Sequence, residues 1–131
     1  MISPLSLVEL YAVLSRLKPH LHLPSGMREV PLDLLVEFIV EDCKLKIAYA
    51  LKLALMEAGG WKSRVPLEYL YALRLAERLK LRTLDLLHVI LATLTRDLVD
   101  SFVTGDHEIL ERRREIRELL GLEIVAPGEL I

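Results

Sequence analysis

Apolar residues recur every three or four positions over much of this chain, a spacing typical of helices that bury one face. The first such segment begins at Ser6, where Leu7, Leu10 and Leu14 share a face, and it ends before Pro19. The longest segment predicts a helix over 31–58, with a break near 41–44. Gly59-Gly60 ends it, and a basic loop, 61–64, follows. The same spacing predicts three further helices, over 66–79, 84–98 and 107–120.

Short apolar segments between these helices are rich in β-branched residues and predict strands. They are 29–30, 99–104 and 122–125. Helices that alternate with short apolar strands favour an α/β fold with a parallel sheet. We expect residues 1–131 to form a single domain, since the length fits one domain.

Composition narrows the class of protein. Hydrophobic residues make up 53% of the chain and charged residues 27%, which excludes intrinsic disorder. The formal net charge is −2, and neither half is strongly polarised, so a bulk electrostatic nucleic-acid binder is not indicated. The single cysteine, Cys43, and the lack of a long apolar run or signal peptide predict a cytoplasmic protein without a membrane anchor. The absence of Asn and Gln is typical of proteins from thermophiles.

Three acidic residues fall at or near the predicted beginnings of helices. Glu9 follows Ser6, the expected N-cap of the first helix, by three residues, a spacing that fits a capping box. Asp85 follows Thr83, the expected cap of the helix over 84–98, by two residues. Asp106 lies between a predicted strand and a predicted helix. Taken singly, each has an ordinary interpretation as a capping or dipole-stabilising residue. At one edge of a parallel sheet, the three carboxylates would instead form an oxygen-rich site suited to Mg²⁺ or Mn²⁺.

Four segments together resemble the PIN-domain family of metal-dependent nucleases, which includes the VapC-type toxins of toxin–antitoxin pairs. They are SLVELYAVLSR (6–16), RTLDLLHVILA (82–92), DSFVTGDHEIL (100–110) and LEIVAP (122–127). The resemblance implies a helix-rich, three-layer α/β/α fold with a short, mostly parallel sheet. It also implies a Mg²⁺- or Mn²⁺-dependent endoribonuclease, a toxin-like component whose partners are RNA and an antitoxin protein.

The same resemblance assigns roles to individual residues. Glu9, Asp85 and Asp106 fall on the family's acidic positions and would be the catalytic residues and metal ligands. Thr104 and His88 match the surrounding pattern and would support the site, Thr104 by positioning Asp106.

One landmark of the family has no counterpart in these 131 residues. The family's first acid is an Asp at the end of a central first strand, upstream of the point that matches Met1, so we expect an N-terminally truncated version of the fold. Three explanations stay open: a natural protein that begins further upstream, a homodimer partner or rearranged helices that fill the gap, and a relative without activity. The alternative function is therefore a catalytically impaired PIN-like module that binds a partner or RNA.

Basic residues near these motifs are candidates for binding the RNA backbone. They are Lys62, Arg64, Arg78, Lys80 and Arg82. Their ordinary interpretation is a solvated helix face paired with nearby acids. The Arg112–Arg114 run, surrounded by glutamates, predicts a salt-bridged helix face. A helix-turn-helix over 66–79 and 84–98 is disfavoured, because its second helix is largely apolar.

Overall fold

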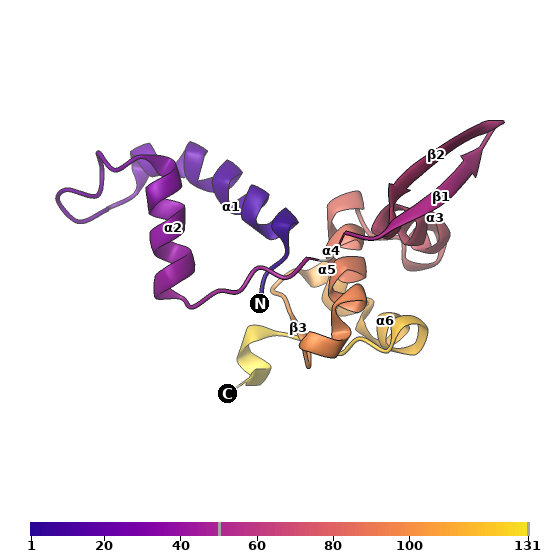
Figure 1. The fold of residues 1–131 in the computed structure, drawn as a ribbon. Coiled ribbons are helices and arrows are strands. Elements are labelled where there is room, and N and C mark those ends of the chain that lie inside the picture. The colour runs from indigo at the N-terminus through magenta and orange to yellow at the C-terminus, as the bar shows by residue number, and fades with distance from the viewer. Residues whose placement is uncertain (50, 131) are drawn as a thin grey trace. The chain divides into compact units, whose positions relative to one another are not determined.

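The computed structural model describes residues 1–49 and 51–130, and the chain divides into two compact units, Met1–Ala48 and Tyr49–Ile131 (Figure 1). Over these residues the protein is mixed α/β and rich in helix, with two small sheets of short strands. No helix in the described ranges is long and apolar enough to cross a membrane. The single-domain arrangement and the three-layer architecture stay predictions.

The first unit contains two helices, α1 (Pro4–Leu17) and α2 (Leu32–Asp42), with a short 3₁₀ turn at Lys18–His20. Its small core buries Leu14 of α1 against Leu35 and Val36 of α2. Of the helix predicted over 31–58, only α2 forms. It ends at Asp42, in the polar segment 41–44 where the break was expected. The predicted strand at 29–30 is wrong, because these residues lie in the turn that leads into Pro31.

Helix α1 begins earlier than its apolar spacing predicts. Ser3 is the N-cap, its hydroxyl accepts a hydrogen bond from the backbone N–H of Ser6 at 3.1 Å, and Pro4 occupies the first helical position. A serine cap followed by proline is a favoured helix start, since proline has no N–H to leave unpaired. Ser6 is thus inside the helix, and the predicted capping box of Ser6 and Glu9 is wrong.

The second unit begins with a β-hairpin that the sequence did not reveal. Strands β1 (Leu53–Ala58) and β2 (Trp61–Pro66) pair antiparallel and are joined by Gly59 and Gly60. Both glycines have positive φ angles, 55° and 78°, which two-residue hairpin turns of this kind require. The prediction of a helix through Ala58 and a loop at 61–64 is therefore wrong. The two glycines reverse the chain instead of merely ending a helix.

The rest of this unit matches the predicted order of elements. Helices α3 (Leu67–Leu79) and α4 (Thr83–Leu94), both labelled in Figure 1, are confirmed. Strand β3 (Phe102–Val103) pairs parallel with β4 (Ile124–Val125). The predicted helix over 107–120 is two helices, α5 (His107–Glu111) and α6 (Arg113–Leu120). Two 3₁₀ turns, Arg96–Leu98 and Pro127–Leu130, complete the unit.

One apolar core holds these elements together. Helix α4 contributes Leu86, Val89 and Ile90, which are all nearly inaccessible to solvent. The remaining buried members come from the other elements: Leu79 of α3, Ile109 of α5, Ile116 of α6, and Leu122 and Ile124 at β4. Because α4 and α5 share this core, their N-terminal ends are fixed relative to each other.

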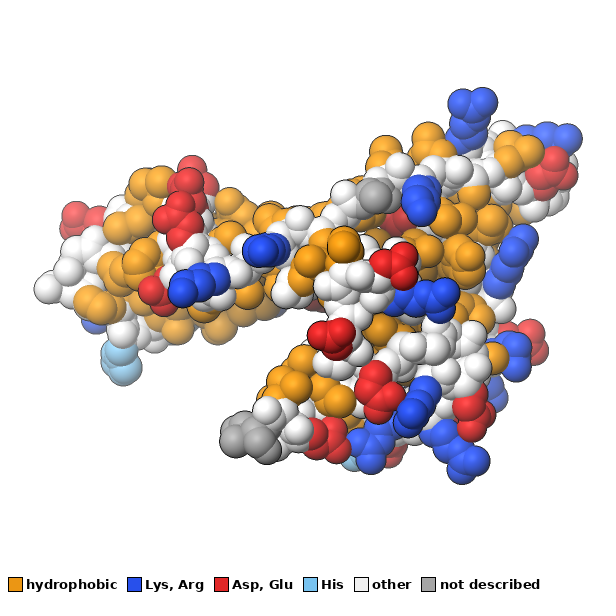
Figure 2. Space-filling view, turned by 60° about the horizontal axis from the view of Figure 1, so that its bottom comes forward, with side chains coloured by type: hydrophobic (Ala, Val, Ile, Leu, Met, Phe, Trp, Pro, Cys, Tyr) orange, Lys and Arg blue, Asp and Glu red, His pale blue; other side chains and the backbone are white. Residues whose placement is uncertain are grey.

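The surface of the second unit carries intermixed acidic and basic side chains (Figure 2). The predicted salt-bridged face around Arg112–Arg114 is confirmed. Its ion pairs join Arg112 to Glu115, Arg113 to Glu129 and Arg114 to Glu118, at 3.0–3.1 Å. These arginines are therefore engaged with glutamates of the chain itself.

Replacing a core residue of the second unit should lower its stability strongly. Ile116 is fully buried, and Ile116→Ala would leave a cavity, which costs about 3 kcal/mol in free energy of unfolding. Urea denaturation at 25 °C measures the change. Leu73→Ala is the matched control, because Leu73 is 62% exposed on α3 and should change stability by less than about 0.5 kcal/mol. Equal effects of the two substitutions would contradict the placement of the core.

Candidate functional site

The N-terminal end of α4 carries the first acid of the candidate site. Lys80 adopts a left-handed conformation (φ 51°, ψ 34°) that ends α3, and Arg82 occupies the N-cap position of α4. Thr83 was expected to cap this helix but is its first residue. Asp85 lies in the first helical turn, where the helix dipole favours a carboxylate, and its side chain is 17% exposed.

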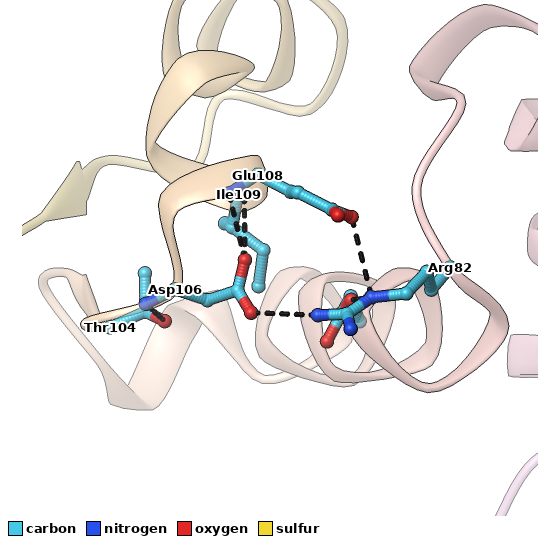
Figure 3. A network of polar contacts seen from close by, with 6 residues as sticks. Arg82, Thr104, Asp106, Glu108 and Ile109 are labelled. Atoms are coloured by element: carbon cyan, nitrogen blue, oxygen red, sulfur yellow. Dashed lines mark hydrogen bonds and ion pairs between the residues drawn. The ribbon is translucent and has the colours of Figure 1, made fainter.

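Asp106, three residues after the end of β3, supplies the second acid. It is the N-cap of α5, and its Oδ1 accepts hydrogen bonds from the backbone N–H groups of Glu108 at 2.8 Å and Ile109 at 3.2 Å. The backbone N–H of Asp106 donates to the Oγ1 of Thr104 at 3.0 Å (Figure 3). These contacts fix the orientation of the Asp106 carboxylate. Thr104 contacts the backbone of Asp106, so it holds the turn that presents the acid.

Arg82 contacts both acids. Its Nε donates to the Oδ2 of Asp85 at 2.8 Å, and its Nη2 donates to the Oδ2 of Asp106 at 2.9 Å. The Nε also lies 3.3 Å from the Oε2 of Glu108, and Figure 3 shows the guanidinium between the side chains of Asp106 and Glu108. The hydrogen bond to Asp85 and the charges of Asp85, Glu108 and Asp106 raise the pKa of the Arg82 guanidinium above its ordinary value.

The sequence did not indicate that Glu108 and Arg82 would take part in this cluster. Glu108 was not a candidate, although its place two residues after Asp106, in the first turn of a helix, could have indicated it. Arg82 was expected to bind RNA, whereas here it binds carboxylates from two helices. The spacing of Arg82 and Asp85, three residues apart across a helix start, was the available signal for that pair.

The third predicted acid lies in the other unit. Glu9 is a half-buried residue of α1. Its convergence with Asp85 and Asp106 stays a prediction. His88 lies on α4, three residues after Asp85, and is half-buried; its supporting role also stays a prediction.

The predicted RNA-binding residues fall into two groups within the second unit. Lys62 and Arg64 lie on β2, where Lys62 pairs with Glu57 at 3.1 Å. Arg78 and Lys80 are exposed at the end of α3, next in sequence to Arg82. All four side chains are exposed, and their binding of RNA stays a prediction.

The donor chemistry of the acid pair suits a hard divalent cation. Mg²⁺ prefers carboxylate and water oxygens, and it is commonly held by one or two carboxylates together with waters and substrate phosphates. Asp85 and Asp106 supply two such carboxylates within reach of one cationic group. Among the described residues, no group of three or more His, Cys, Asp or Glu side chains is placed to hold a metal ion. The pair therefore fits Mg²⁺ or Mn²⁺ with few protein ligands, and not a closed cage.

Loss of the Asp106 side chain should weaken the start of α5. Asp106→Ala removes the acceptor for two backbone N–H groups and should lower the free energy of unfolding by about 1 kcal/mol. Asp106→Asn keeps an oxygen acceptor and should cost less. Asp100→Ala, at an exposed position, is the control. Urea denaturation measures all three, and an Asp106→Ala effect no larger than that of Asp100→Ala would refute the capping role.

Likeness to known proteins gives no further guidance on this site. No protein-family profile, curated protein or solved structure matches the chain. The PIN-domain resemblance consequently depends on the motifs around Glu9, Asp85 and Asp106, and it stays a prediction.

Proposed function

We propose that this protein is a PIN-like, Mg²⁺- or Mn²⁺-dependent endoribonuclease, a toxin-like component of a toxin–antitoxin pair with a three-layer α/β/α fold. The observation that carries the proposal is the meeting of Asp85 and Asp106 on one guanidinium. These two acids come from separate motifs, 21 positions apart in the sequence, and both motifs resemble that family. Their convergence is what a shared cation site requires.

In this proposal the chain's own residues position the reaction. Asp85 and Asp106 would hold the cation, and a bound cation would supply Lewis-acid chemistry, making a water more acidic and offsetting the charge of the phosphate. Asp106 is suited to this task because two backbone N–H groups hold its Oδ1 and leave its Oδ2 directed at the cationic partner. Thr104 holds the turn before it. Glu9 would complete the acidic set, and His88 would support it.

The substrate would be held by cations of the chain. Lys62 and Arg64 on the hairpin, with Arg78 and Lys80 at the end of α3, would bind phosphates of the RNA. Exposed apolar side chains on α1 and α2, among them Val8, Leu34 and Phe38, would be covered by an antitoxin or by a second copy of the chain.

A second candidate function is the catalytically impaired module that binds a partner or RNA. The observation that favours it is that Arg82 already neutralises part of the acid cluster. A protein of this kind would bind RNA in EDTA and leave it intact when Mn²⁺ is added.

A cleavage assay separates the two functions. We expect the 131-residue chain to cleave single-stranded RNA with Mn²⁺ and not with EDTA. Asp85→Asn should lower the rate by at least about 100-fold, since a metal's charge stabilisation is worth several kcal/mol in the barrier.

The matched control is Asp97→Asn, because Asp97 is an exposed acid of the same unit outside the cluster, and it should leave the rate unchanged. Binding without Mn²⁺-dependent cleavage would favour the impaired module. If Asp85→Asn cleaves RNA at the rate of the unaltered chain, the proposed site is refuted.

A further inference from the structure

The most unusual feature of the acid cluster is that its cation belongs to the chain itself. The Arg82 guanidinium contacts three carboxylates, those of Asp85, Asp106 and Glu108, from the first turns of two helices. The four side chains carry a formal net charge of −2. The cluster is therefore short of positive charge even with Arg82 in place.

The cation and the anions of this cluster differ in how firmly they are held. The Arg82 side chain is 65% exposed, whereas those of Asp85 and Asp106 are 17% and 29% exposed. Exposed ion pairs are weak, so the arginine can leave its partners at low cost. Asp106 cannot move as easily, because its Oδ1 is bound to two backbone N–H groups of α5. A largely exposed cation thus contacts two less exposed carboxylates, of which that of Asp106 is held in place by its helix cap.

The atoms that Arg82 uses are also the ones that a metal would need. Arg82 binds the Oδ2 of Asp85 and the Oδ2 of Asp106, and the other oxygen of Asp106 is used by the helix cap. A divalent ion at the same two oxygens would lie next to the guanidinium, and the two like charges would repel. The acid pair can therefore hold one of the two cations at a time.

We propose that Arg82 is a built-in counter-cation that competes with Mg²⁺ or Mn²⁺ for the carboxylates of Asp85 and Asp106. This inference rests on the proposed function, because it requires a metal at the acid pair. Without metal, Arg82 keeps the carboxylates from repelling each other. When metal binds, Arg82 leaves, and its planar fork of N–H donors is free to bind a phosphate beside the site.

Metal titration of an Arg82 variant tests the competition directly. We expect Arg82→Ala to bind Mn²⁺ about fivefold to tenfold more tightly than the unaltered chain, measured by isothermal titration calorimetry, because the competing ion pairs are lost. Arg74→Ala is the matched control. It removes an exposed arginine of α3 that has no part in the proposed site, and it should bind Mn²⁺ within about twofold of the unaltered chain.

An NMR measurement reports on Arg82 itself and does not depend on activity. The Nε–H resonance of Arg82, assigned by its loss in Arg82→Ala, should shift and exchange faster with water when Mg²⁺ is added. In Asp85→Asn the resonance should not respond to Mg²⁺ in this way. A resonance that stays unchanged while Mg²⁺ saturates the unaltered chain would overturn the competition.

The outcomes also separate this inference from the proposed function. Equal or weaker Mn²⁺ binding in Arg82→Ala, with binding that is lost in Asp85→Asn, would overturn the competition and leave the metal site standing. Binding of Mn²⁺ by neither the unaltered chain nor Arg82→Ala would overturn both. Tight binding that appears only in Arg82→Ala would support the competition most strongly.

Discussion

Burial of the apolar face of α4 positions the helices and the short strand that pack against it in the second unit. Leu86, Val89 and Ile90 pack in one core with residues of α5 and α6, so the helices cannot shift independently without opening a cavity. The acids at the N-terminal ends of α4 and α5 therefore lie close together as a result of packing, although their like charges repel.

Packing places two carboxylates close together, and electrostatics then requires a positive charge between them. Carboxylates that share a site repel each other unless a cation or a proton intervenes. Arg82 supplies that charge from the N-cap of α4, at the head of the helix that carries Asp85. A divalent ion would meet the same requirement. The one cluster therefore suits both the state with Arg82 at the acid pair and the proposed state with a metal there.

The sequence predicted the parts of this structure that local rules determine. The spacing of apolar residues located α1, α3 and α4, and the position of Asp106 after a strand identified a helix cap. The hairpin of 53–66 was missed, because its leucine-rich strand also fits a helix and only the left-handed Gly59-Gly60 turn decides between them. The link between Arg82 and Asp106 was missed because it spans 24 positions and depends on how α4 and α5 pack.

The central claim is that Asp85 and Asp106 form one cation site, which Arg82 occupies until a metal takes its place. A crystal structure of the protein grown with Mn²⁺ and recorded with anomalous diffraction tests this most directly. The account predicts an anomalous peak in coordination contact with the carboxylates of Asp85 and Asp106, with the Arg82 side chain turned away from both. It would be contradicted by a saturated crystal in which Arg82 still bridges the two acids and manganese lies elsewhere.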